Sequence, residues 1–269
     1  MMKWALLAPA LILCAVFLVW PMGEIIWMSL NKVGVMGDTF VGLRNYARIA
    51  TDTRFLRSMI NSAFYILLLT PINVGGVVLI VLSTVDLSKR WQDAVRFVFY
   101  IPSMAAGVIV ASVWEWVFHW DGPVNWLFGT HIAWFGEAVT AIPVIALITA
   151  SVGFGGGTII LLAAALSIDP DLYDAARIDG ASPRQIKWRI TLPIIMPTIW
   201  LLTLLSVIAG PQIIEYIIAL APYEHSATMA FSIYTSAFII GRHGQASAQA
   251  MVLLVLLLGL AWAKSKVAK

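Results

Sequence analysis

The sequence predicts an all-α, polytopic membrane protein with about six transmembrane helices, and three observations lead to this fold class. Apolar residues make up 61% of the 269 residues, and the mean hydropathy is +0.89. Charged residues make up only 12%, about half the usual share in a soluble domain. The apolar residues also gather into stretches of about 20, the length at which a helix crosses the hydrocarbon core of a bilayer. We expect a single transmembrane domain over residues 1–269.

Six apolar windows reach the length of a membrane span. The first follows Lys3, lacks a small-residue cleavage pattern and is longer than the core of a signal peptide, so we expect a retained helix that bends near Pro21. The six predicted spans, in chain order, are Ala5–Met28, Met59–Ser83, Val95–Phe118, Val139–Leu166, Leu192–Leu220 and Ala246–Ala263.

The distribution of positive charge predicts the orientation. Eleven of the 17 Lys and Arg residues fall in connections that are cytoplasmic if both termini lie inside, although five of the other six gather in the first external connection. This orientation places residues 167–193 in the cytoplasm and attributes the net charge of +3 to topology, not to nucleic-acid binding. The eleven are Lys3, Lys89, Arg90, Arg96, Arg177, Arg184, Lys187, Arg189, Lys264, Lys266 and Lys269.

A polar segment over residues 167–183, which contains several helix start and stop signals, interrupts the apolar sequence. Asp169 before Pro170 is typical of a helix start, and we expect a short helix over about Asp171 to Ile178. Gly180 then supplies the left-handed residue that helix ends commonly need. Ser182, Pro183 and Gln185 form a capping-box pattern that starts a second helix. The segment is therefore predicted to be a helix, a sharp glycine turn and a second helix.

Several chemistries are not supported by the sequence. The glycine-rich run at 153–157 lacks the lysine of a phosphate-binding loop, so we expect no ATP hydrolysis by this chain and attribute the run to close helix packing or bending. The single Cys14 lies within an apolar span and forms no disulfide within the chain. The four histidines lack metal-type spacing, and no catalytic set stands out. We expect no bound metal or cofactor.

Glu215 is the acidic residue that we expect inside the fifth span. A carboxylate at the centre of a bilayer is costly by roughly 2.5–3.5 kcal/mol on insertion scales unless it faces a cavity or a partner. Glu215, with Gln212 one turn earlier and the adjacent Tyr216, is therefore a candidate for a substrate pathway. A structural role, in which Glu215 is hydrogen-bonded to another helix or lies at shallower depth, is equally compatible with the sequence. Pro211 is expected to interrupt the helix here.

The polar segment and several other motifs resemble a known family. The stretch Tyr173-Asp174-Ala175-Ala176-Arg177-Ile178-Asp179-Gly180, followed by Pro193 and Pro197, is similar to the EAA loop of permease subunits of binding-protein-dependent ABC importers. Asp174 occupies the position that is usually a glutamate in the Glu-Ala-Ala pattern of this family. The stretches 40–46, 101–102, 122–127 and 244–248 are similar to the carbohydrate-uptake branch, which includes permeases for maltose and glycerol phosphate. The resemblance covers nearly the whole chain.

This resemblance implies a fold, partners and a mechanism. It implies a type I ABC importer permease in the bacterial inner membrane, paired with a second permease, two ATPase subunits and an extracytoplasmic binding protein, and otherwise in contact with lipid. ATP and Mg²⁺ would be used by the ATPase partner. The cytoplasmic helix would act as a coupling helix, through Tyr173, Asp174, Ala175, Ala176, Arg177, Asp179 and Gly180.

The implied function is the ATP-driven import of a sugar, oligosaccharide or related polyol compound. The competing class is a self-contained, ion-coupled secondary transporter in which Glu215 takes part in coupling. A six-span chain without a visible inverted repeat fits that class poorly. The chain is expected to be a transport subunit and not an enzyme.

Overall fold

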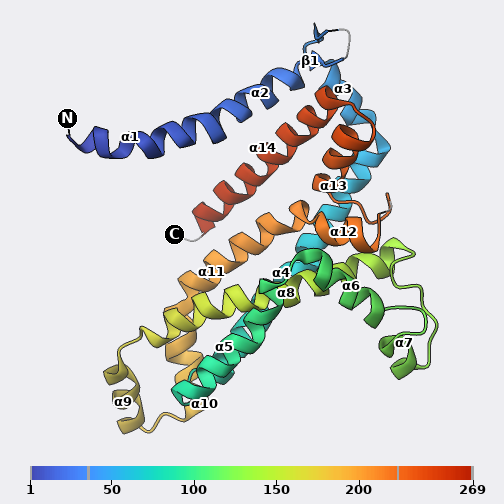
Figure 1. Ribbon diagram of the computed structural model, residues 1–269. Coiled ribbons are helices and arrows are strands. Elements are labelled where there is room, and N and C mark those ends of the chain that lie inside the picture. The colour runs from blue at the N-terminus through green and yellow to red at the C-terminus, as the bar shows by residue number, and fades with distance from the viewer. Residues whose placement is uncertain (1, 35–36, 223, 268–269) are drawn as a thin grey trace.

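The protein is built almost entirely of helices, which the computed structural model describes over residues 2–34, 37–222 and 224–267 (Figure 1). Lys269, which the orientation prediction counts, lies outside these residues. The helices are α1 (Met2–Cys14), α2 (Trp20–Ser29), α3 (Arg44–Thr51), α4 (Thr53–Thr84), α5 (Lys89–Met104), α6 (Gly107–Val117), α7 (Pro123–Phe128), α8 (Ala138–Leu166), α9 (Pro170–Ile178), α10 (Pro183–Ile186), α11 (Leu192–Ala209), α12 (Glu215–Leu220), α13 (Met229–Tyr234) and α14 (His243–Val267). Shorter elements are the π-helical turns η1 (Ala15–Val19), η2 (Lys187–Thr191) and η4 (Thr235–Ile239), the 3₁₀ turn η3 (Gly210–Gln212), and the strands β1 (Asn31–Lys32) and β2 (Thr39–Phe40).

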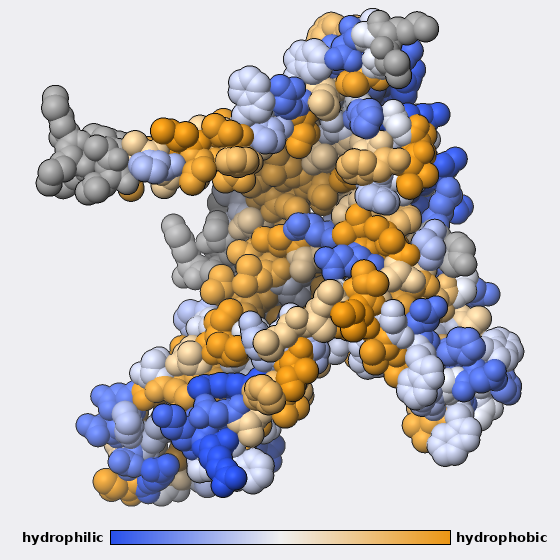
Figure 2. All heavy atoms as spheres, in the orientation of Figure 1, coloured by the Kyte–Doolittle hydropathy of each residue, from blue (hydrophilic) through white to orange (hydrophobic). Residues whose placement is uncertain are grey.

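The number of membrane spans agrees with the predicted fold class. Within the described residues, five helices are long and apolar enough to cross a membrane, or six if α5 and α6 together form one span. The surface view shows hydrophilic residues gathered at the end of the molecule that carries α9 and α10, and apolar residues over the helices between the two ends (Figure 2).

The first span is an arm that extends from the rest of the molecule. α1, η1 and α2 make one apolar span over Leu7–Ser29; its apolar 18-residue window has no buried residue, and Ser29 is the buried residue of α2. The bend near Pro21 stays a prediction; what the structure has before Pro21 is the π-helical turn η1, followed directly by α2, which begins at Trp20. α2 lies beside α14, whereas α1 stands away from the other helices (Figure 1). Lipid or another protein must therefore cover this arm.

The centre of the molecule is a close pairing of α4 and α8, which α5 flanks. A Cβ atom on Gly157 would lie 2.7 Å from a methyl group of Val77 on α4, and one on Gly155 would lie 2.6 Å from the carbonyl oxygen of Phe99 on α5. The glycine-rich run therefore faces two neighbouring helices, so the prediction of close helix packing is confirmed. Around this pairing, Tyr65, Ile145 and Ile217 belong to one buried apolar cluster.

The third predicted span, Val95–Phe118, is wrong as a single helix. α5 and α6 meet at 98° across a break at Ala105 and Ala106, which are both extended. Pro102 in the last turn of α5 has no N–H to donate to the helix, which weakens the helix shortly before the break. α6 therefore crosses the direction of α5 instead of continuing it.

The fifth predicted span, Leu192–Leu220, also ends earlier than expected. α11 stops at Ala209, and the 3₁₀ turn that contains Pro211 separates it from α12. The interruption expected at Pro211 is confirmed, but Glu215 begins a separate short helix and is not inside the span. The apolar helix over Met229–Ile239, formed by α13 and η4, was not predicted.

Candidate functional site

The segment that joins α8 to α11 has the helix-turn-helix geometry that its sequence predicts. The Asp169 carboxylate accepts the Asp171 N–H at 3.0 Å and caps α9. Gly180 has a φ of +80°, its N–H donates to the Arg177 carbonyl, and the next N–H donates to the carbonyl of Ala176. This pair of bonds is a Schellman motif, which fixes the end of α9. The predicted caps and glycine turn are thus confirmed.

The second helix of the segment starts with a complete capping box. The Ser182 N–H donates to the Gln185 side chain at 2.7 Å, and the Gln185 N–H donates to the Ser182 hydroxyl at 3.3 Å. Each short helix therefore has its own cap, and the glycine turn sets the angle between them. The caps and the turn together restrict the backbone of this helix-turn-helix segment to one defined conformation.

α9 has no buried residue and presents an uncovered surface. Leu172 and Ile178 are apolar but 48% and 86% exposed. Asp174 and Arg177 form an exposed ion pair at 2.7 Å. Ala175 is exposed and Ala176 half-buried, and Asp179 and Gly180 are exposed at the end of the helix.

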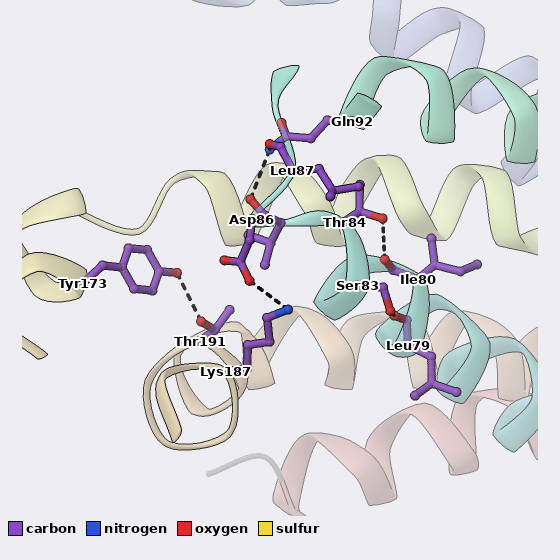
Figure 3. Close-up of polar contacts among 11 residues, drawn as sticks. Leu79, Ile80, Ser83, Thr84, Asp86, Leu87, Gln92, Tyr173, Lys187 and Thr191 are labelled. Carbon is purple, nitrogen blue, oxygen red and sulfur yellow. Dashed lines mark hydrogen bonds and ion pairs between the residues drawn. The ribbon is translucent and has the colours of Figure 1, made fainter. Parts of the chain in front are cut away.

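Tyr173 is the member of the predicted set that points into the molecule. Its ring packs against the buried cluster that includes Val81 and Leu162, and its hydroxyl lies 3.2 Å from the hydroxyl of Thr191 in η2 (Figure 3). Beside it, a cavity of about 660 Å³ separates α9 from the turn between α4 and α5. Tyr173 thus anchors one side of α9 while the other side stays uncovered.

Gln212, Glu215 and Tyr216 come together at a second site, on the wall of one open cavity of about 380 Å³. Gln212 and Glu215 are exposed to it, whereas Tyr216 is largely buried. The Gln212 amide donates to the Ile208 carbonyl at 2.9 Å, one turn earlier on α11. The remaining lining residues are Thr149, Leu205, Ile208, Ala209, Ile213 and Ile214.

Two helix breaks meet at Glu215. Its carboxylate packs against Gly107, the first residue of α6, so closely that any side-chain carbon on Gly107 would overlap a carboxylate oxygen. The first N–H groups of a helix carry partial positive charge, which favours a carboxylate at this position. The break between α5 and α6 and the break before α12 therefore form one polar site among apolar helices.

A set of polar side chains on α4, which the sequence reading missed, holds the chain beside this site. The Asn61 amide donates to the carbonyls of His225 and Ala227, both at 3.0 Å. The Tyr65 hydroxyl donates to the Ser226 carbonyl at 3.2 Å, and the Ser62 hydroxyl accepts the Met229 N–H at 3.0 Å. Polar residues at positions 61, 62 and 65 of an otherwise apolar span were the available signal.

No cluster of three or more His, Cys, Asp or Glu residues that could hold a metal ion is found in the part of the chain that the structure describes. Neither site therefore offers a metal centre among these residues. What the two sites do offer is a capped, exposed helix at one end and a polar cavity at two helix breaks.

Comparisons with known proteins agree with this architecture. The family model described as the binding-protein-dependent transport system inner membrane component matches residues 54–262. The multiple sugar-binding transport system permease protein MsmF of Streptococcus mutans is 27% identical, with 94% of this chain and 90% of that protein covered. The sn-glycerol-3-phosphate transport system permease protein UgpA of Brucella abortus is 26% identical, with 95% and 90% covered.

A solved structure extends the similarity to the whole fold. A chain of a bacterial ABC transporter involved in the import of the acidic polysaccharide alginate superposes with a TM-score of 0.83 and 26% identity, covering 100% of this chain and 96% of that one. A chain of a bacterial alginate ABC transporter in complex with an alginate pentasaccharide-bound periplasmic protein superposes with a TM-score of 0.84 and 25% identity. The chain belongs to the family of binding-protein-dependent transport system inner membrane components, as a multi-pass permease subunit of an ABC importer.

Proposed function

We propose that this chain is one of two permease subunits of an ATP-driven importer for a sugar, oligosaccharide or related polyol compound. The observation that carries this proposal is similarity over almost the whole chain to permeases named for sugars, glycerol phosphate and alginate. These named substrates are all rich in hydroxyl or acidic oxygen groups. The cavity at Gln212 and Glu215 offers hydrogen-bonding groups of the kind such compounds need.

The proposed coupling element is the 167–193 segment, with α9 docked on a separate ATPase subunit. The contact surface is formed by Asp174, Ala175, Ala176 and Arg177, which lie on a capped helix without a buried residue in the part of the chain that the structure describes. Small alanines let a partner approach closely, and the Asp174–Arg177 ion pair supplies polar groups at the edge. Tyr173 anchors the helix from behind, and Asp179 and Gly180 set its end.

The proposed substrate pathway runs past Gln212, Glu215 and Tyr216. Discontinuous helices commonly form the binding sites of transporters near the middle of the membrane, because the unpaired backbone groups at a break are available to a substrate. Glu215 lies where two such breaks meet. The second permease subunit would complete the cavity from the other side.

The proposal also includes the orientation of the chain in the membrane and the other subunits of the complex. Both termini and α9 lie in the cytoplasm of a bacterium, in the inner membrane, and a binding protein delivers substrate from the opposite side. The complex contains this chain, a second permease, two ATPase subunits and the binding protein. ATP and Mg²⁺ are bound by the ATPase subunits, and this chain carries no cofactor of its own.

Reconstitution of the complete complex tests the proposal. The complex would be purified from the genes encoded beside this one, placed in proteoliposomes, and screened with mono- and oligosaccharides and sn-glycerol 3-phosphate for stimulation of ATPase activity. We expect at least one compound to stimulate ATP hydrolysis and to be taken up only when ATP is supplied. Uptake by this chain alone, driven by a proton or sodium gradient, would instead establish the ion-coupled class.

A further inference from the structure

An ion pair joins the 167–193 segment to the turn between α4 and α5. The Lys187 ammonium in η2 lies 2.8 Å from the carboxylate of Asp86, and the two side chains are 26% and 58% exposed. The close-up shows Lys187 reaching from the wide turn at the base of α11 to Asp86, beside the Tyr173–Thr191 contact (Figure 3). The pair connects two parts of the chain that are a hundred residues apart.

Few other contacts connect α9 to this region. α9 buries none of its residues, and the cavity of about 660 Å³ lies between it and the side chains of Val85 and Asp86. Movement of α9 therefore reaches the end of α4 in two ways: through the packing of the Tyr173 ring against the cluster that includes Val81, and through two polar contacts. Those contacts are the Tyr173–Thr191 hydrogen bond, which joins α9 to η2, and the Lys187–Asp86 ion pair, which joins η2 to the α4–α5 turn.

The turn that carries Asp86 is firmly attached to both of its helices. The Gln92 amide on α5 donates to the Val85 carbonyl at 3.1 Å and to the Leu87 carbonyl at 2.9 Å. The carbonyl groups at the end of α4 are thus satisfied by a side chain of α5. Because of these bonds, a displacement of Asp86 moves the adjoining ends of α4 and α5 together.

α4 also reaches the second site. Near its other end, Asn61, Ser62 and Tyr65 hold the chain between α12 and α13, next to the cavity that contains Glu215. A series of contacts therefore leads from α9 through Thr191, Lys187 and Asp86 into α4, and from α4 to the cavity.

We propose that Asp86 and Lys187 are positioning residues that transmit the movement of α9 to α4 and α5 during the transport cycle. This inference rests on the proposed function, because it takes α9 as the element that receives force from an ATPase subunit. It adds a cross-connection between the coupling segment and helices that do not adjoin it in the sequence.

Pulsed electron paramagnetic resonance on the assembled complex tests this inference. In a Cys14→Ser background, spin labels at Ser88→Cys and Arg184→Cys report the distance across the ion pair in nanodiscs, without nucleotide and with MgATP and vanadate. With the ion pair intact, we expect one narrow distance distribution with the same mean in both states. Asp86→Asn and Lys187→Gln should broaden it and lower the vanadate-trapped fraction by about two- to fivefold, the range for an ion pair of this exposure.

Charge reversal and a matched control separate transmission from simple loss of stability. The double variant Asp86→Lys with Lys187→Asp should restore the narrow distribution and the trapped fraction. Asp93→Asn is the control, because it removes a pair of similar exposure, Asp93–Arg96 at 3.1 Å, that lies within α5 alone. It should leave both readouts unchanged.

Two results would overturn the inference. One is a distribution unaffected by either single variant, and the other is a double reversal that fails to restore what both single variants lose. An intact chain that fails to assemble with the ATPase subunits would contradict the proposed function itself, and the inference with it. The readouts need MgATP and vanadate only, so they do not depend on knowing the transported compound.

Discussion

Gly180 fixes the angle between α9 and α10, and its backbone has a left-handed conformation that is unfavourable for residues with a side chain. Its φ of +80° lies in the left-handed region, where residues other than glycine lose roughly 1–2 kcal/mol, and β-branched residues lose more. A Cβ atom at this position would meet no other atom within 4 Å. Any effect of substitution therefore comes from the backbone conformation and not from crowding.

Gly180→Val is accordingly expected to distort the turn and to reduce ATP-driven uptake at least tenfold, while the chain still inserts into the membrane. Gly180→Asn is the matched control and should retain most activity, because asparagine tolerates the left-handed conformation. Uptake by proteoliposomes and co-purification of the ATPase subunit are the measurements. Full uptake by the valine variant would show that the turn geometry is unimportant.

The contact between the Glu215 carboxylate and Gly107 also depends on single residues. Gly107→Ala places a methyl group where the Glu215 carboxylate lies, so the carboxylate has to move away from the start of α6. We expect Gly107→Ala and Glu215→Gln to lower substrate-stimulated ATPase activity and uptake together, by about tenfold, since the first moves the carboxylate away from the start of α6 and the second removes its negative charge. Gly75→Ala is the control for a change of glycine to alanine within a helix, because a Cβ atom there would meet no atom within 4 Å.

If both variants at the Gly107–Glu215 contact kept normal transport and normal ATPase stimulation, Glu215 would have a structural role only. A drop in protein yield without a drop in activity per complex would lead to the same conclusion. The two readouts together therefore distinguish the pathway role from the packing role that the sequence left open.

At the scale of elements, the run of glycines in α8 determines how closely three helices approach. Gly155 faces the backbone of α5, whereas the adjacent Gly156 faces open space. Gly155→Ala should destabilise the purified chain by about 1–3 kcal/mol, because the new methyl group meets backbone atoms that cannot rotate away. Gly156→Ala should be neutral or slightly stabilising, since it removes a glycine from a helix interior without a contact.

Thermal unfolding of both variants in detergent, followed by size-exclusion chromatography, measures this difference. The comparison is sharp because the two positions are adjacent on one helix and differ only in what they face. Equal stability of the two variants would mean that α5 and α8 do not approach as closely as the structure describes.

The elements also show which features can be read from a sequence. The caps at Asp169 and Ser182 and the turn at Gly180 were predicted correctly because each depends on residues within four positions of one another. The break in the third span was not predicted, and the fifth span was predicted to continue past its break at Pro211, because hydropathy averages composition over a window. At the bend before Gly107, the packed carboxylate belongs to Glu215, more than a hundred residues away, a contact that no local window contains.

The set of polar residues on α4 shows the same limit. Asn61, Ser62 and Tyr65 are recognisable as polar positions in an apolar span, but their partners lie in the connection after α12. Sequence alone gives no register between these two parts of the chain. The pathway residues Gln212, Glu215 and Tyr216 were grouped from their closeness in the sequence, and their roles remain predictions.

At the scale of the whole molecule, the distribution of charge predicts one orientation in the membrane. In a Cys14→Ser background, single cysteines at Ser88 and Arg184 should be protected from a membrane-impermeant thiol reagent added to intact cells. A cysteine at Asp121 should react. Labelling before and after permeabilising the cells provides the measurement, and the reverse pattern would invert the proposed topology.

The arm formed by α1 and α2 is less constrained by packing than the rest of the molecule. None of the three buried clusters includes a residue from either helix, and the family model begins at Arg54. α2 packs beside α14 and buries Ser29, so substitutions are expected to leave the fold of the remaining chain intact only in α1 and η1, where selection acts through what touches these residues in the membrane. In a cell with several related importers, this is the segment in which sister subunits are free to diverge while their transport machinery stays the same.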